Sequence, residues 1–169
     1  EFECKNGLMD GYYYEWNTAS STEKVVGQYE KGLMTGKWTY FYKNGKKKAT
    51  GIFINGDGSN KSELTMIPKN GRDGEWIFWY DSKTPWMEGG VMEVSNYKNG
   101  KLNGSSILYH ENGQKKEEST FIDDKLNGYS KWWYESGNIS REGKYKDDNQ
   151  TGRWILYNED GSTKEEKIF

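Results

Sequence analysis

Residues that could perform acid–base or nucleophilic chemistry are few in this sequence, and their spacing does not suit it. The chain has one histidine, His110, and one cysteine, Cys4. A catalytic triad needs a histidine beside a nucleophile, and a structural zinc site needs four ligands that are mostly Cys or His. His110 takes a position that Tyr42, Tyr80 and Tyr134 occupy in similar segments. We therefore interpret His110 as a variant of a structural position, and we expect no enzymatic activity.

The acidic residues and paired glycines also fit structural roles. Acidic pairs such as Asp123-Asp124 and Asp147-Asp148 stand at expected turns, which favours solvated side chains over a glycosidase-type carboxylate pair. Asp57 lies among glycines, but the ligand spacing of an EF-hand calcium loop is absent. Gly89-Gly90 lacks the strand–helix context of a phosphate loop. We predict no catalytic residue, no metal site and no cofactor.

Aromatic side chains are the unusual feature of the composition. The 169 residues include 13 Tyr, 8 Trp and 6 Phe, together 16% of the chain. Each ring can bury roughly 150–250 Å², so rings can supply a core that aliphatic residues do not. The 24 basic and 26 acidic residues give a net charge of −2, which does not predict nucleic-acid binding. No apolar run is long enough to predict a transmembrane segment.

Glycines reveal about six tandem repeats of about 24 residues. An opening glycine begins each aromatic or apolar run, and in most copies a second glycine follows it. A copy can be read from Tyr97 to Gly113, and another from Phe121 to Gly137. The opening glycines are Gly11, Gly36, Gly74, Gly104, Gly128 and Gly152.

Each repeat predicts two antiparallel strands joined by short turns. The stretches that follow the opening glycines, for example 37–42, 75–80 and 153–157, have the aromatic and β-branched composition of strands. Second strands are expected at 25–29, 49–53, 92–97, 118–121 and 140–145, with turns at dipeptides such as Asn99-Gly100. Each second strand ends at an aromatic residue, here called the boundary aromatic: Tyr29, Phe53, Tyr97, Phe121 and Tyr145. A small residue stands two positions before each of them, where it would let a ring of the neighbouring strand lie over the backbone. These small residues are Gly27, Gly51, Ser95, Ser119 and Gly143.

An insertion at about residues 57–73 interrupts the period in the middle of the chain. We expect an enlarged hairpin with one added strand at Glu63–Ile67, closed by the segment Pro68–Gly71. Excursions of this kind on repeat arrays often lie on the binding face.

The unit Tyr-x-Asn-Gly-x-x-x-Gly-x-Trp-x-x-Tyr-Tyr-x-x-Gly resembles the bacterial variant MORN repeat, whose proteins are often grouped as YwqK-like antitoxins. The resemblance runs from Cys4 to Phe169, and it departs from the pattern at the insertion and at Ser106 and Ser130, where Trp is expected. It implies an all-β fold, an elongated single-layer antiparallel meander of hairpins over residues 1–169, without catalytic residues. It also implies a role in protein or envelope contacts.

The sequence therefore predicts a protein-binding repeat protein, either antitoxin-like or at the cell envelope. A cell-wall, glycan or choline-binding module is the alternative, because aromatic cages bind quaternary ammonium groups. An enzyme is the third reading, and association with a second copy of the chain stays open. Since the sequence begins at Glu1, an envelope or secreted location is favoured over a cytoplasmic one. The same rings could instead form the core of the sheet. The candidate partner-binding residues are Trp38, Tyr40, Tyr42, Trp76, Phe78, Tyr80, Trp132 and Tyr134.

Overall fold

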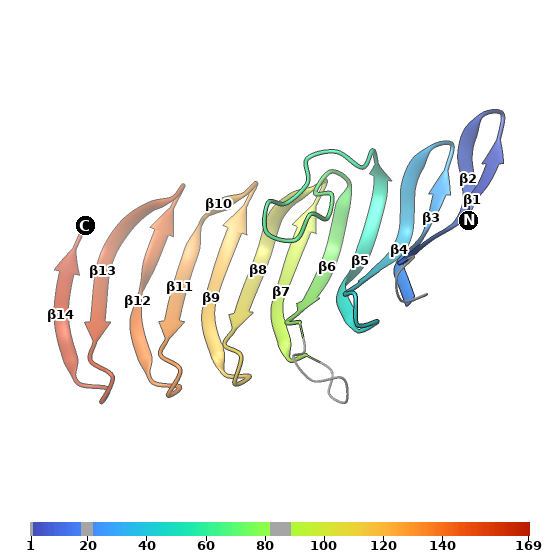
Figure 1. Ribbon diagram of the computed structural model, residues 1–169. Coiled ribbons are helices and arrows are strands. Elements are labelled where there is room, and N and C mark those ends of the chain that lie inside the picture. The colour runs from blue at the N-terminus through green and yellow to red at the C-terminus, as the bar shows by residue number, and fades with distance from the viewer. Residues whose placement is uncertain (1, 18–21, 82–88) are drawn as a thin grey trace. The chain divides into compact units, whose positions relative to one another are not determined.

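The computed structural model describes residues 2–17, 22–81 and 89–169, and every element in these ranges is a β-strand (Figure 1). The chain divides into two compact units. The first unit comprises residues 1–90 and 97–101, and the second comprises residues 91–96 and 102–169. No helix that could cross a membrane occurs in these described ranges.

The strands of the first unit lie in chain order, and each pairs antiparallel with the next. They are β1 (Phe2–Lys5), β2 (Leu8–Asn17), β3 (Thr22–Glu30), β4 (Leu33–Phe41), β5 (Lys47–Gly56) and β6 (Arg72–Trp79). The end of β7 (Val91–Lys98), from residue 97 onward, also belongs to this unit.

The second unit repeats the same arrangement, with β8, β9, β11, β12, β13 and β14 paired antiparallel in that order. The short β10 also pairs with β9. The bounds are β8 (Lys101–Tyr109), β9 (Lys115–Ile122), β10 (Lys125–Leu126), β11 (Gly128–Trp133), β12 (Ile139–Lys146), β13 (Asn149–Tyr157) and β14 (Thr163–Ile168). The predicted all-β meander of tandem hairpins is confirmed, whereas elongation and a single array over residues 1–169 stay predictions.

The turns between hairpins lie where the sequence predicts them. Asn99 and Gly100 have φ angles of 51° and 82°, and Asp147 and Asp148 have 49° and 67°. Two successive residues with positive φ form the type I′ turn, whose twist matches that of the flanking strands. Asn and Asp tolerate this conformation better than other residues with a side chain.

The strands that contain the opening glycines begin earlier than predicted. The predicted strand at 37–42 is part of β4, which begins at Leu33 and passes through Gly36. Gly36 has a φ of 64°, and the pairing of β4 with β5 shifts between Met34 and Gly36. The opening glycine therefore forms a bulge within a strand and does not precede its start, which is a role that glycine often has in sheets.

The strand predicted at Glu63–Ile67 is wrong. Residues 63–65 form a turn, Met66 has a φ of 59°, and an isolated bridge between Lys61 and Pro68 is the pairing that closes this part of the insertion. The backbone nitrogen of Met66 donates to the carbonyl of Ser62 at 2.7 Å. The loop therefore satisfies part of its backbone hydrogen bonding internally, without a partner strand.

Candidate functional site

Three tryptophans lie over glycines of a neighbouring strand, as the sequence predicts. The relative exposure of Trp38, Trp76 and Trp154 is 1% or less. A Cβ atom added to Gly27, Gly51 or Gly143 would overlap the indole of Trp38, Trp76 or Trp154, respectively. Each ring thus occupies the space that a side chain on the underlying strand would need.

Hydrogen bonds and ring contacts hold these indoles in place. The Nε1–H groups of Trp76 and Trp154 donate to the carbonyls of Ile52 and Lys144 at 3.1 Å. Boundary aromatics pack against the same rings edge to face: Phe53 has its centroid 4.9 Å from that of Trp76, and Tyr145 lies equally far from Trp154. Satisfied donors and edge-to-face packing are typical of core aromatics.

Serines replace this tryptophan–glycine pair in the middle of the sequence. Ser95 and Ser106 bring their Oγ atoms within 2.6 Å of each other, and Ser119 and Ser130 stand at the same sequence offset. All four are buried, and the Oγ of Ser130 has no hydrogen-bond partner. The missing tryptophans at Ser106 and Ser130 are therefore matched by serines where the other copies have glycine.

The sequence-predicted binding residues fall in both units, and four of the eight are buried. Trp38, Tyr40, Trp76 and Phe78 of the first unit are buried, and Tyr80 is partly buried. Their burial favours the reading that these rings form the core. Partner binding through them stays a prediction.

The aromatic position six residues after the opening glycine connects successive repeats. The hydroxyl of Tyr42 donates to the carbonyl of Trp79 at 2.6 Å, and that of Tyr134 to the carbonyl of Tyr157 at 2.8 Å. His110 makes the equivalent contact, with Nε2 3.0 Å from the carbonyl of Trp133. This contact supports the interpretation of His110 as a variant of the tyrosine position.

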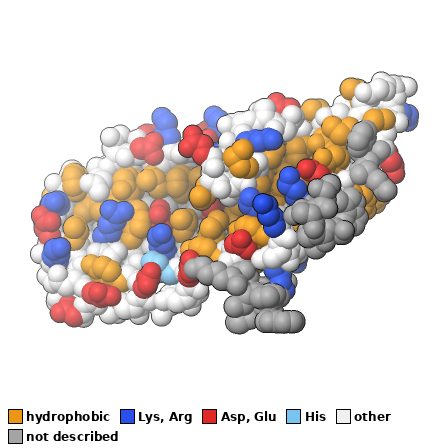
Figure 2. All heavy atoms as spheres, in the orientation of Figure 1, with side chains coloured by type: hydrophobic (Ala, Val, Ile, Leu, Met, Phe, Trp, Pro, Cys, Tyr) orange, Lys and Arg blue, Asp and Glu red, His pale blue; other side chains and the backbone are white. Residues whose placement is uncertain are grey.

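Trp132 is the most accessible of the predicted tryptophans. The guanidinium of Arg141 lies over its ring at 4.0 Å, and the ring of Trp154 lies 6.0 Å away. Figure 2 shows hydrophobic side chains gathered in a band on the drawn face of the second unit.

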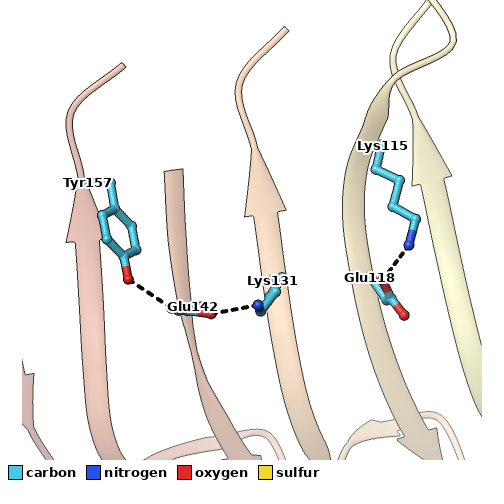
Figure 3. A network of polar contacts seen from close by, with 5 residues as sticks. All are labelled: Lys115, Glu118, Lys131, Glu142 and Tyr157. Atoms are coloured by element: carbon cyan, nitrogen blue, oxygen red, sulfur yellow. Dashed lines mark hydrogen bonds and ion pairs between the residues drawn. The ribbon is translucent and has the colours of Figure 1, made fainter. Parts of the chain in front are cut away.

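Charged side chains connect neighbouring strands in the second unit (Figure 3). Glu142 on β12 accepts hydrogen bonds from Lys131 on β11 at 3.0 Å and from Tyr157 on β13 at 2.8 Å. Partial burial alone would raise the pKa of Glu142, but the hydrogen bonds from Lys131 and Tyr157 outweigh it and lower the pKa below 4.5. Within β9, Lys115 pairs with Glu118 at 2.7 Å. This network fits a structural role on a solvated surface.

The insertion folds back over the aromatic residues of the first unit, and Arg72 holds it there. The buried guanidinium of Arg72 donates to the carbonyls of Pro68 and Ile67 at 2.8 and 3.0 Å, and to the hydroxyl of Tyr97 at 3.1 Å. It also lies 4.8 Å from the ring centroid of Trp76. Sequence reasoning missed this residue, because other copies of the repeat carry Met34, Leu126 or Gln150 at the same position and so give no sign of a buried cation.

A groove of about 430 Å³ lies between the insertion and the aromatic residues of β2, β3 and β4. Its volume falls within the usual range of ligand-binding pockets. We call it the insertion groove. Its walls include the rings of Tyr13, Tyr29, Trp38 and Tyr40 on one side and Ile67 and Pro68 of the insertion on the other.

Charged residues stand around this aromatic floor. Lys24 pairs with Glu15 at 3.2 Å, and Lys48 donates to the carbonyl of Thr65 at 2.7 Å. Burial lowers the pKa of Lys48, and the positive charge of Lys24 lowers it further, while Asp81 opposes the shift. Burial also raises the pKa of Tyr40 well above 10.

Three segments of the chain match the family model described as the MORN repeat variant: residues 34–55, 102–123 and 126–147. The first segment contains most of β4 and β5, and the other two cover strands from β8 to β12. No curated protein matches the sequence significantly. The bacterial origin and the antitoxin grouping stay predictions. Segments of both units therefore match the MORN repeat variant.

Proposed function

We propose that this chain is a non-catalytic repeat module that binds a protein partner at the insertion groove. The observation that carries the proposal is an aromatic-lined groove beside a loop with exposed apolar side chains. Leu64 and Met66, which precede the buried Ile67, are 81% and 64% exposed. Exposed apolar side chains beside a preformed cavity are typical of protein-interaction sites.

The ionisable groups of the groove support binding over catalysis. The pKa values of Tyr13, Tyr29 and Tyr40 are raised above 10 mainly by burial, so their hydroxyls stay protonated at neutral pH. Glu15 is engaged by Lys24 and by the hydroxyl of Tyr13 at 3.3 Å. A general base near neutral pH needs a pKa close to 7, which these tyrosines do not have.

The positive charges of Lys24 and Lys48 disfavour the choline alternative at this groove, because a quaternary ammonium ligand would be repelled. Neutralisation of a toxin and contact at the cell envelope are specific forms of the present proposal. Both would require a protein surface that fits the groove and the apolar tip of the insertion.

Selection of a displayed random-peptide library on the full chain tests the proposal. We expect enrichment of peptides whose binding falls about tenfold or more when Leu64 and Met66 are both changed to Ser, since a few apolar anchors carry most interface energy. The matched control is Ile122→Ser, which removes an apolar side chain that is 52% exposed in the second unit. The proposal would be contradicted if no specific peptide were enriched, or if the Leu64/Met66 double variant and Ile122→Ser lost peptide binding equally.

A further inference from the structure

The rim of the insertion groove is basic, although the whole chain is slightly acidic. Lys24, Lys48 and Lys61 line the groove, and Glu15 is the one acidic side chain among the described residues that line it. The chain as a whole has a net charge of −2. The local excess of positive charge therefore belongs to this site and does not reflect the overall composition.

Lys48 has unused capacity for a carboxylate. Its Nζ donates to the carbonyl of Thr65 and lies 5.7 Å from the ring centroid of Tyr42. An ammonium group carries three N–H donors, and one carbonyl accepts only one of them. Among the residues that the structure describes, no carboxylate forms an ion pair with Lys48. Pairing with a carboxylate stabilises a partly buried ammonium group that has no ion pair more than it stabilises an exposed one.

The floor of the groove is apolar, whereas its rim is basic. The side chains of Val25 and Met34 and the rings of Tyr29, Trp38 and Tyr40 form an apolar surface. A ligand that satisfies both parts needs an apolar side chain next to an acidic group. A short segment of a protein with aspartates or glutamates around one large apolar residue has this pattern.

We propose that the insertion groove binds an acidic segment of a partner protein, with an apolar side chain on the aromatic floor and a carboxylate paired with Lys48. This inference rests on the proposed function and specifies its ligand. Lys61 contributes a second positive charge at the rim, whereas the charge of Lys24 is paired with Glu15. The exposed side chains of Leu64 and Met66 contact the same segment from the insertion.

Two labelled peptides and the full chain test the inference by fluorescence anisotropy. Both peptides carry one central leucine, flanked by aspartates in the first and by lysines in the second. We expect only the aspartate peptide to bind, with an affinity that falls as the salt concentration rises. Lys48→Gln should weaken its binding about tenfold, as expected for one charge-assisted hydrogen bond, whereas Lys48→Arg should retain it.

Lys47→Gln is the matched control. Lys47 is the neighbouring residue, but its Nζ lies 5.9 Å from the ring centroid of Trp79 and it does not line the groove. Binding should be unchanged in this variant, and thermal melting should show that all variants stay folded. Equal binding of the two peptides, or equal effects of Lys47→Gln and Lys48→Gln, would overturn the inference. If displayed peptides bind at Leu64 and Met66 without acidic residues, this inference fails while the proposed function stands.

Discussion

At the scale of single residues, the fold depends on matched pairs formed by one bulky ring and one absent side chain. Gly27 pairs with Trp38 and Gly143 with Trp154, whereas Ser95 pairs with Ser106 and Ser119 with Ser130. A tryptophan needs a glycine beneath it, because a Cβ atom would occupy the volume of the ring. Two serines fill the same position with small side chains on both strands. The two kinds of pair are therefore alternative solutions to one packing problem.

We predict that Gly143 and Trp154 are energetically coupled. Gly143→Ser alone forces a side chain into the indole and should lower the free energy of unfolding by about 1–3 kcal/mol. Trp154→Ser alone leaves a cavity and should cost about 3–5 kcal/mol. The double variant recreates the serine pair, so its loss of unfolding free energy should be smaller than the sum of the two single losses by at least about 1 kcal/mol. Urea unfolding of the four proteins measures this coupling.

The reverse conversion is the control for this double-mutant cycle. Ser130→Trp should be destabilising alone and tolerated together with Ser119→Gly, because that pair would then match Gly143 and Trp154. Simple additivity of the single changes in both conversions would show that the rings and glycines are independent.

At the scale of structural elements, the insertion behaves as a loop fixed from one side. Arg72 on β6 contacts the carbonyls of Ile67 and Pro68, and Ile67 is 2% exposed. The tip of the insertion, with Leu64 and Met66, extends beyond this anchor and is exposed. The anchor thus determines where the far wall of the insertion groove lies.

Arg72→Met should release the insertion. Loss of the guanidinium leaves the buried carbonyl of Pro68 without its donor and that of Ile67 with only the backbone N–H of Ser62. This should lower the free energy of unfolding by about 1–3 kcal/mol. Trypsin should then cleave at Lys61 or Lys69 faster than in the unchanged protein. Arg141→Met is the control, because that exposed guanidinium stacks on Trp132 and should contribute less than about 1 kcal/mol. Unchanged cleavage in Arg72→Met would argue against the anchor.

Local features of these elements could be read from the sequence, and long-range ones could not. The repeat period includes the turn at Asn99-Gly100 and the small residues at Gly27, Gly51 and Gly143. The turns and the glycines that lie beneath tryptophan rings could therefore be predicted. The offset that joins Ser119 to Ser130 is also present in the sequence, but it does not by itself indicate that the two serines pack together. The contacts of Arg72 with Ile67 and Pro68 have no period, because they are made to the one segment that interrupts the repeats.

At the scale of the whole molecule, buried tyrosines make the stability of the fold sensitive to alkaline pH. Burial raises the pKa of Tyr40 above that of an unfolded tyrosine, which is about 10. The group therefore contributes its full stability below pH 10 and loses it as the pH rises toward its folded pKa. Tyr13, Tyr29 and Tyr42 shift in the same direction, also mainly through burial.

Tyr40→Phe should resist alkaline unfolding better than the unchanged protein. Phenylalanine keeps the ring and does not ionise, so the two proteins should have similar stability at pH 7 and diverge above about pH 10. Urea unfolding at pH 7 and pH 11, followed by circular dichroism, measures the difference. Parallel losses of stability in the two proteins would show that ionisation of Tyr40 does not limit folding.

The matched pairs also restrict the order in which repeats can be joined. Each pair links the second strand of one repeat to the first strand of the next, so every repeat has an incoming and an outgoing type. Residues 34–55 carry Trp38 and Gly51, and residues 102–123 carry Ser106 and Ser119. Each of these could be duplicated in tandem, but placing 34–55 directly after 102–123 would force a serine beneath Trp38. Residues 126–147, with Ser130 and Gly143, join the serine type to the tryptophan type, and the copy with Trp76 and Ser95 joins them in the opposite direction. The order of the repeats is therefore constrained by their matched pairs.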